Sequence, residues 1–391
     1  MAKNKDVKSK EVAVNKKDNT GLPIDLLKTL AKFGVVPRVD HDHVKMQDTS
    51  SPRLNWLMGG GIPVGRVTTL SGKRKTGKST IATIISAATL EQFPDGYVFY
   101  FDTENKFDIA WAESLGVDMS RFIFCPIETG EQLINALCGT VDSPGILAFP
   151  GLRGLVIDSI RGTKWDAEAN ATAEQQQFGV GGKMWNKFAR MTSSRIKASD
   201  AWVLILNGVY KTMDANSHEM IEPGGEGVPF MASLRMRTKP LEVLPDAGVK
   251  INLKCLESQV GRNSAREGTI VVNFVGNKAV VNPLPEMSAL AKDLEAIEMS
   301  GSWYKVGDEK WNGATEFEKA MADDPELFDH VYDAVMAKMN PDYTPPARTY
   351  EEFLGEDHAD LPLDTEEAST LNADEDGVIV SELLEITTEE S

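Results

Sequence analysis

One segment, residues 66–93, limits the possible folds of this chain more than any other. It runs from a short apolar strand, RVTTL, through the loop GKRKTGKS, into a helical pattern that extends from Ser79 to about Phe93. The loop fits the spacing G-x-x-x-x-G-K-S/T, whose glycines let backbone amides point inward at phosphate oxygens, while the helix adds its positive end. The segment therefore predicts a site for a nucleoside triphosphate, ATP or GTP.

Each position of this loop has an expected role. Lys78 would reach the β- and γ-phosphates, and the Ser79 hydroxyl would ligate Mg²⁺. The three cations inside the loop either contact phosphate or face solvent. The residues predicted to bind the nucleotide here are Gly72, Lys73, Arg74, Lys75, Thr76, Gly77, Lys78, Ser79 and Thr80.

Further apolar runs indicate the fold class. Short, continuously apolar stretches at 97–101, 154–158 and 202–206 alternate with helical stretches. Strands that are buried on both faces of a parallel sheet have this pattern. Residues 240–285 instead alternate in polarity, which predicts antiparallel strands closing the sheet. The expected fold is α/β, a mostly parallel twisted sheet with helices on both faces.

Two of these strands lead into carboxylates. Asp158 ends one apolar strand and would hold the metal ion through water. Glu104 follows the strand at 97–101, at the end that lies beside the phosphates in a doubly wound sheet. A carboxylate there can polarise a water for attack on the γ-phosphate, or it can simply cap the next helix. The residues by themselves leave both readings open.

Charge is distributed unevenly along the chain. The net charge of −18 over 391 residues, taken whole, argues against a nucleic-acid partner. Residues 351–391, however, carry fifteen Asp or Glu and no Lys or Arg, so the other 350 residues carry only about −3. Residues 1–18 carry +3. A nearly neutral body between a basic arm and an acidic tail does not exclude DNA.

Composition excludes several other classes. No apolar run approaches the ~18 residues of a membrane span, and no apolar segment follows the lysine-rich start as in a secretory signal. The cysteines, Cys125, Cys138 and Cys255, are too few and too scattered for a disulfide framework or a zinc site. We therefore expect a cytoplasmic protein without a membrane partner.

Longer segments around these motifs resemble the RecA recombinases of bacteria and their phage relatives. They are PRLNWLMGGGIPVGRVTTLSGKRKTGKST at 52–80, FYFDTENKFDIAWAESLGVD at 99–118, ETGEQL at 128–133, LVIDSI at 155–160 and GGEGVPFMASLRMR at 224–237. Residues 300–338 are similar to the small C-terminal domain of that family. The resemblance covers residues from about 23 to 340, and its departures from the family pattern favour a phage or another mobile element as the source.

Composition and the resemblance together predict the domain organisation. A disordered basic arm at 1–22 precedes an oligomerisation helix and linker at 23–45. A RecA-like ATPase core follows at 46–285, with DNA-binding loops at about 165–183 and 208–226. A small α+β C-terminal domain at 286–340, mostly helical with a turn around 301–313, leads into a linker and a disordered acidic tail at 341–391.

The resemblance also implies roles at the nucleotide. Glu104 falls on the family's catalytic glutamate, and Lys78 would stabilise the γ-phosphate. Asp108 and Trp111 fall where an Asp and an aromatic residue contact the adenine. An indole suits stacking on a purine, although Trp111 can also be read as a core residue on a helix face.

Two departures concern the γ-phosphate. In RecA a Gln follows the Asn at the end of the strand here at 202–207, and it signals the γ-phosphate to the second DNA loop. This chain has Gly208 there, so Asn207 or a group from a neighbouring subunit would have to substitute. The family's two lysines from the adjacent subunit are not preserved either, and Arg262 is the predicted replacement.

The two polar, glycine-rich loops match the family's DNA-binding loops, and without that match we would read them as ordinary solvated loops. Glycine amides and cations there could hold phosphates, and Phe178 could wedge between bases. The predicted DNA-binding residues are Phe178, Gly179, Lys183, Asn186, Arg190, Tyr210, Lys211, Gly224, Gly225 and Lys239.

The implied function is ATP- and Mg²⁺-dependent polymerisation on single-stranded DNA, followed by pairing with homologous duplex DNA. ATP would lie between subunits of a helical filament, and single-strand-binding and loader proteins are further implied partners. Two other readings stay open: a ring-forming motor of the replicative helicase type, and a DNA-binding mediator that uses ATP as a switch with little hydrolysis.

Overall fold

The computed structural model describes residues 43–140, 142–170, 180–211, 220–244 and 247–340, and five single residues before them. Of the helix predicted at 23–36, Asp25, Lys28, Thr29 and Lys32 are helical and Phe33 is an exposed turn residue, while the remaining residues of this segment lie outside the described part. The predicted basic arm and acidic tail lie outside it as well. The described residues from Lys45 onward belong to one compact unit, which contains every element discussed below.

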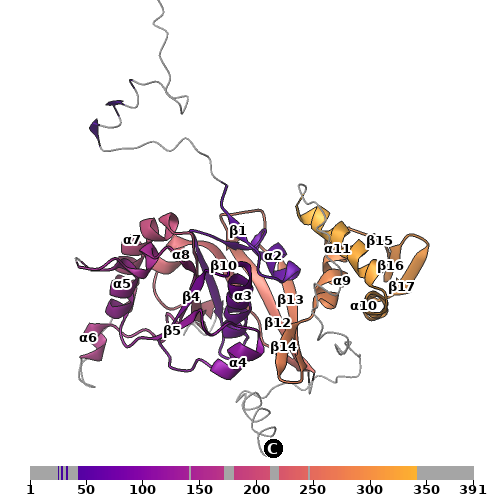
Figure 1. Ribbon diagram of the computed structural model, residues 1–391, viewed down its shortest axis with the longest axis horizontal. Helices are drawn as coiled ribbons and strands as arrows, with labels where there is room; N and C mark the ends of the chain where they lie inside the picture. The colour runs from indigo at the N-terminus through magenta and orange to yellow at the C-terminus, as the bar shows by residue number, and fades with distance from the viewer. Residues whose placement is uncertain are drawn as a thin grey trace, which may run out of the picture. The chain divides into compact units, whose positions relative to one another are not determined.

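A ten-stranded sheet forms the core of this unit among the described residues (Figure 1), in the order β14-β13-β12-β10-β3-β7-β6-β4-β5, with β11 paired to β12 off this path. Its parallel ladder contains β3 (Val67–Gly72), β4 (Tyr97–Asp102), β5 (Phe122–Pro126), β6 (Leu152–Asp158), β7 (Trp202–Gly208) and β10 (Ala232–Thr238). Its antiparallel part contains β11 (Glu242–Leu244), β12 (Gly248–Ser258), β13 (Glu267–Val275) and β14 (Lys278–Val281). The predicted α/β class, with antiparallel strands closing the sheet, is confirmed.

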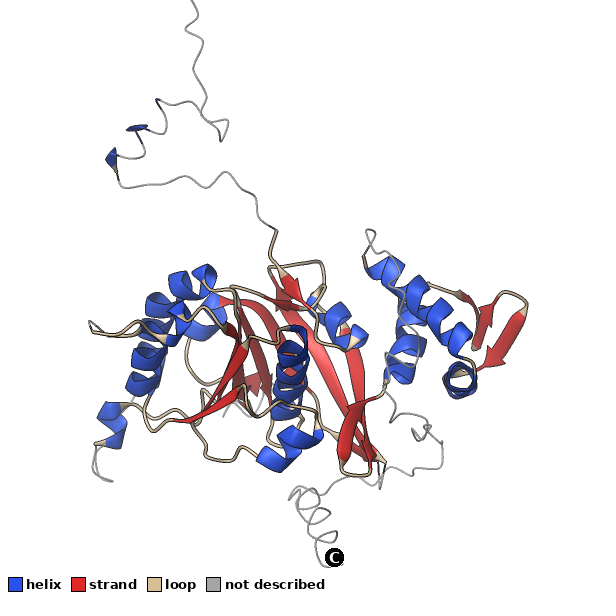
Figure 2. Cartoon of the chain, in the orientation of Figure 1, coloured by secondary structure: helices blue, strands red, loops and turns tan. Residues whose placement is uncertain are grey.

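Helices cover both faces of this sheet (Figure 2). On one face α3 (Lys78–Gln92) and α4 (Ile109–Ser114) share a core with Leu204 and Leu206 of β7. On the other, α5 (Gly130–Cys138) and α7 (Val180–Ala198) share a core with Val203 and Ile205. Successive strand residues point to opposite faces, so a strand covered on both sides is apolar at every position.

Shorter elements complete the described part of the chain before residue 282. They are β1 (Met46–Gln47), α2 (Pro52–Met58), β2 (Ile62–Pro63), a 3₁₀ turn η1 (Ile146–Ala148), α6 (Asp166–Ala169), β8 (Tyr210–Lys211), β9 (Met220–Ile221) and α8 (Gly227–Met231).

Residues 283–339 build a separate hydrophobic cluster around Leu290, Phe317 and Phe328. The elements are α9 (Pro283–Asp293), β15 (Glu298–Ser300), β16 (Trp303–Val306), β17 (Glu309–Asn312), α10 (Ala314–Asp323) and α11 (Pro325–Met339). The α+β prediction for this domain named a turn around 301–313 and gave no strand positions, and β15, β16 and β17 form a three-stranded antiparallel sheet there. Its strands have only three or four residues, so they are too short to show the apolar alternation by which strands are recognised.

Glu286 is a fully buried carboxyl group that connects α9 to the start of α2. Its Oε1 and Oε2 accept hydrogen bonds from Ser51 Oγ at 2.8 and 2.9 Å, and Oε2 also accepts from the Arg53 backbone amide at 3.0 Å. Burial raises the pKa of this carboxyl to about 7, although those hydrogen bonds and the Arg53 charge oppose the rise. The folded protein therefore holds a proton here that the unfolded chain releases near its ordinary pKa of about 4.3.

The contribution of Glu286 to stability should fall as pH rises through the window between these two pKa values. The folded state binds more protons than the unfolded state there, and the loss totals roughly 3 kcal/mol. Glu286→Gln preserves the shape and the uncharged state, so the fall should be absent in this variant. Urea unfolding at about pH 5 and about pH 7.5 measures the difference. The same pH dependence in both proteins would refute this assignment.

Candidate nucleotide and DNA site

The phosphate loop between β3 and α3 requires glycine at both of its framing positions. A Cβ on Gly72 would lie 2.0 Å from Thr238 Oγ1. Gly77 has φ +82°, and its Cβ would lie 2.8 Å from Ile251 Cδ1. A hydrogen bond of 2.6 Å joins Thr76 Oγ1 to Thr238 Oγ1 and fixes the loop to β10. The motif's glycines and its buried threonine are thus explained by packing before any ligand is considered.

Lys78 begins α3 and turns its ammonium group toward the loop. Its Nζ donates hydrogen bonds to Lys73 O at 2.6 Å and to Gly72 O at 3.3 Å. Burial lowers the pKa of Lys78, while the negative charges of Asp158 and Glu104 oppose that change. A partly desolvated cation beside two carboxylates is poised for a multiply charged anion.

Asp158, at the end of β6, faces the first turn of α3. Ser79 Oγ donates to its Oδ2 at 3.0 Å, and Tyr100 Oη donates to the same oxygen at 2.6 Å. Burial raises the pKa of Asp158, and these two donors oppose the rise. A hydroxyl and a carboxylate within hydrogen-bond reach are oxygen ligands of the kind that Mg²⁺ binds. The residues present therefore fit the predicted metal site.

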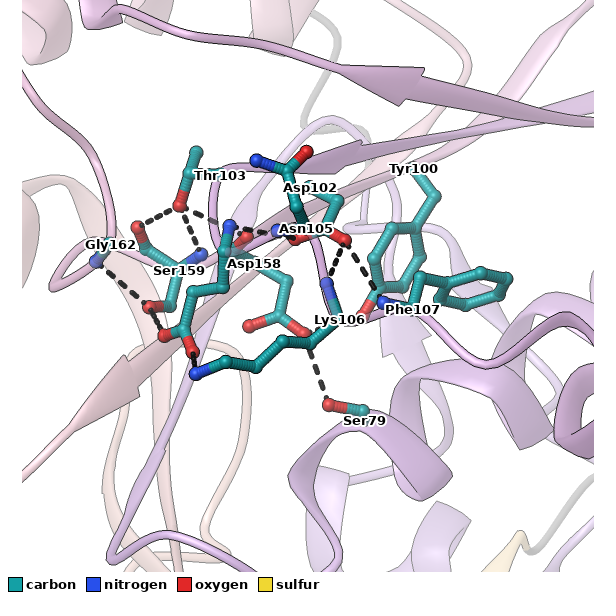
Figure 3. Close-up of polar contacts among 11 residues, drawn as sticks. Ser79, Tyr100, Asp102, Thr103, Asn105, Lys106, Phe107, Asp158, Ser159 and Gly162 are labelled. Atoms are coloured by element: carbon teal, nitrogen blue, oxygen red, sulfur yellow. Dashed lines mark hydrogen bonds and ion pairs between the residues drawn. The ribbon is translucent and has the colours of Figure 1, made fainter.

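Asp102, which the sequence reading did not select, fixes the loop that carries Glu104 (Figure 3). This buried carboxylate at the end of β4 accepts four backbone amides, from Glu104 and Asn105 at 2.8 and 2.9 Å and from Lys106 and Phe107 at 2.8 and 3.0 Å. The available signal was an Asp directly after an apolar strand, since such side chains often bond backbone groups just beyond them.

Glu104 lies between β4 and the segment after β6. Its Oε1 accepts from Ser159 Oγ at 2.7 Å, and its Oε2 pairs with Lys106 Nζ at 3.2 Å. Partial burial raises the pKa of Glu104, but the hydrogen bonds from Ser159 and Lys106 and the charges of Lys106 and Lys78 outweigh this and lower it. Glu104 is therefore ionised at neutral pH.

Asp108, not Glu104, caps the next helix, so the alternative reading of Glu104 as a helix cap is wrong. Asp108 Oδ1 accepts the Trp111 backbone amide at 3.0 Å and so caps α4. The Trp111 indole is half-buried against the core, edge-on to Phe274 with ring centroids 5.9 Å apart. These contacts match the core reading of Trp111, and contact with adenine stays a prediction for both residues.

Three of the predicted DNA-binding residues share one exposed face of α7. Lys183, Asn186 and Arg190 recur at helical spacing, opposite the buried Trp185 and Phe188. Phe178 and Gly179 lie outside the described residues. The described cations and the amide are thus presented together to solvent.

The ends of the two predicted DNA loops meet through glycines. A Cβ on Gly225 would lie 3.1 Å from the Cα of Gly182. Gly224 has φ +103°, and its Cβ would lie 2.8 Å from Ile160 Cγ2, directly after β6. Side chains at these positions would separate the loops, so the glycines permit a close backbone approach.

The other predicted residues are dispersed. Tyr210 and Lys211 form β8 and are exposed, and Lys239 is paired with Glu267 beyond the end of β10. The loop cations Lys73, Arg74 and Lys75 and the predicted trans residue Arg262 are exposed as well. Thr80, in the first turn of α3, is partly buried.

Asn207 faces the second loop. Its Nδ2 donates to Pro223 O at 2.9 Å, while its buried Oδ1 has no partner among the described residues. In the register of the sheet Asn207 pairs with Ser71, and Gly208 pairs with Gly72. The end of β7 therefore lies directly beside the start of the phosphate loop.

Among the described residues, no helix is both long enough and apolar enough to cross a membrane. The same part of the chain holds no cluster of His, Cys, Asp and Glu suited to a metal ion bound by protein side chains alone. The Ser79–Asp158 pair is a different kind of site, in which phosphate oxygens and water would supply the remaining ligands.

The sequence-family model for the RecA N-terminal domain matches residues 25–266 of this chain. Protein RecA of Acholeplasma laidlawii is 25% identical over 278 residues, which cover 70% of this chain and 80% of that protein. Protein RecA of Ureaplasma parvum serovar 3 is 25% identical over 337 residues, covering 83% and 98%. Protein RecA of Streptococcus pneumoniae is 26% identical over 309 residues, which cover 75% of this chain and 76% of that protein. With its parallel sheet, its phosphate loop and these matches, the chain belongs to the RecA family of recombinases.

Proposed function

We propose that this protein is a DNA-stimulated ATPase that polymerises on single-stranded DNA and catalyses homologous pairing and strand exchange in recombination and repair. One observation carries the proposal. The phosphate loop, Asp158 and Glu104 lie at the carboxyl edge of the parallel sheet, and Gly224, where the predicted DNA loops meet, packs on Ile160 at the same edge. Ligands of open parallel sheets bind at this edge.

The described side chains support a specific role for each residue in ATP hydrolysis. Lys78 would hold the β- and γ-phosphates, and the ionised Glu104 would accept a hydrogen bond from the attacking water and orient it. Ser79 and Asp158 would hold Mg²⁺, which when bound neutralises charge on the phosphates. The products are ADP and inorganic phosphate.

DNA would bind along the face formed by α7 and the two loops. Lys183, Asn186 and Arg190 supply donors for backbone phosphates, together with Lys211, Lys239 and the amides of the loop glycines. Phe178 would insert between bases. Because phosphate contacts dominate such binding, affinity for single-stranded DNA should fall as salt rises.

The filament would place ATP between subunits, with Arg262 of one subunit near the nucleotide of the next. In this arrangement the helix at 23–36 docks on the neighbouring core. The acidic tail competes with duplex DNA for cationic surfaces, more strongly at low salt. Single-strand-binding and loader proteins would be its partners in the cytoplasm.

Two contacts support a link between the nucleotide and the second DNA loop. Arg237 Nη2 donates to Glu222 Oε1 at 2.7 Å, and Arg237 Nε donates to Ser71 Oγ at 3.2 Å. Burial raises the pKa of Glu222, but hydrogen bonds to Arg237 and Ser71 and the charges of Arg235 and Arg237 outweigh this and lower it. Glu222 lies in the second loop and Ser71 precedes the phosphate loop, so ATP binding can favour the DNA-bound state and ADP can favour release of DNA.

The test is strand exchange between circular single-stranded DNA and linear duplex DNA, with electron micrographs of the same mixtures. We expect helical filaments with ATP, and joint molecules with a homologous duplex but not with a heterologous one. Rings instead of filaments would favour the helicase-type motor. DNA binding without joint molecules would contradict the proposed strand exchange.

The ATP-switched mediator is the second candidate, and Gly208 is the observation that favours it. A residue without a side chain at the end of β7 removes the group through which the family signals the γ-phosphate. Filaments that form with ATP but turn over almost none of it would favour this candidate.

A further inference from the structure

Arg161 occupies the space that Gly208 leaves open. A Cβ built on Gly208 would lie 3.1 Å from Arg161 Cδ and 3.8 Å from both its Cβ and its Nη1. The side chain is exposed, and its guanidinium forms no hydrogen bond or ion pair with any residue that the structure describes. Arg161 thus brings an unpaired cation to the position where a side chain at residue 208 would begin.

That position lies beside the phosphate loop. Gly208 is paired with Gly72 across β7 and β3, so the end of β7 adjoins the first residue of the loop. The backbone around Arg161 is fixed on two sides. Ile160 N donates to Leu206 O of β7 at 3.1 Å, and toward β4 a Cβ on Gly162 would lie 2.6 Å from Glu104 Cγ. The Arg161 side chain therefore lies beside the end of β7, and the next residue in the chain, Gly162, adjoins the carboxylate that would orient water.

We propose that Arg161 contacts the terminal phosphate of the bound nucleotide from within the same subunit. The inference rests on the proposed nucleotide site and adds a residue that distinguishes a triphosphate from a diphosphate. A guanidinium remains charged at any physiological pH, and its planar fork matches phosphate oxygens in a bidentate manner. A side chain at position 208 would require this arginine to shift, so Gly208 and Arg161 form a complementary pair.

Neighbouring groups are less suited to this task. The Asn207 amide nitrogen already donates one of its two hydrogens to Pro223 O, and the side chain carries no charge that would attract phosphate oxygens. Lys106 is paired with Glu104. Arg161 is therefore a cation beside the end of β7 that forms no ion pair with the described residues and is available to a γ-phosphate.

The test compares nucleotide affinities instead of turnover. The variants are Arg161→Ala and Arg161→Lys, with Arg66→Ala as control, since Arg66 precedes β3 at the opposite edge of the sheet. Isothermal titration with Mg²⁺ measures the dissociation constants of a non-hydrolysable ATP analogue and of ADP. We expect Arg161→Ala to weaken binding of the analogue by about tenfold to a hundredfold with ADP affinity unchanged, as for loss of a hydrogen bond to a charged group. Arg161→Lys should fall between, and Arg66→Ala should match the wild type.

Each other outcome would overturn the proposal in a recognisable way. If Arg161→Ala and the wild type prefer the ATP analogue over ADP to the same degree, Arg161 does not contact the γ-phosphate, while the proposed function stands. Arg161→Ala could instead weaken binding of single-stranded DNA to the same extent with and without nucleotide, with the preference for the ATP analogue over ADP unchanged. That result would make Arg161 a DNA contact. A wild type that binds neither nucleotide removes the proposed function and this inference together.

Discussion

Replacing Glu104 by Gln should slow ATP hydrolysis by about a hundredfold to ten-thousandfold while leaving ATP and DNA binding near the wild-type level. The amide oxygen can still accept the hydrogen bond from Ser159, which is 2.7 Å in the present structure, so the loop keeps its shape. The neutral amide, however, cannot take a proton from water or draw it toward the γ-phosphate. Because Asp102 fixes the loop independently through four amides, the change should not unfold the site.

Phosphate release measures the rate of ATP hydrolysis, and filter binding with labelled single-stranded DNA measures the affinity for DNA that the variant retains. Glu91→Gln is a matched control, since Glu91 is an exposed carboxylate near the end of α3 that is remote from the phosphate loop. Filaments of Glu104→Gln should persist longer on DNA, because ATP is not consumed. Hydrolysis at the wild-type rate would show that Glu104 is not the catalytic base.

The second large effect is expected from Lys78→Ala, which should lose ATP-dependent filament formation. The variant removes the cation that lies against Gly72 O and Lys73 O and that would hold the β- and γ-phosphates. A hydrogen bond to a charged group contributes enough that ATP affinity should fall by roughly tenfold to a hundredfold.

Equilibrium binding of a fluorescent ATP analogue and micrographs with single-stranded DNA measure both consequences. Lys319→Ala, at an exposed position of α10, controls for the general loss of one positive charge. Thermal unfolding of Lys78→Ala should match the wild type, because this lysine makes only two loop contacts. Normal filaments with ATP would exclude the assigned role of Lys78.

The parallel part of the fold was predictable because its strands are buried on both faces. Residues 202–206 are apolar at every position, and Val203 and Leu204 indeed enter different cores. The predicted strand at 97–101 extends by one residue, to Asp102, and the predicted helix from Ser79 begins at Lys78. The strands of the sheet at 298–312 were not placed, because elements of three or four residues are too short to show a periodic pattern.

The residues of the candidate site were predictable to the extent that local spacing identifies them. The phosphate loop and the strand-end position of Asp158 follow from short motifs that the parallel sheet brings to one edge. The four amide bonds of Asp102 depend on a loop conformation that no local pattern specifies. The contact between Gly208 and Arg161 depends on how the ends of two strands from distant parts of the chain lie side by side. Contacts of this kind emerge only when the sheet is assembled.

The rate of ATP hydrolysis with and without single-stranded DNA, measured at two magnesium concentrations, tests the central claim most directly. A RecA-like recombinase should turn over ATP faster when DNA is added, and the stimulation should disappear in Glu104→Gln. Turnover that is absent, or unaffected by DNA at both magnesium concentrations, would contradict the account of this protein as a DNA-stimulated ATPase.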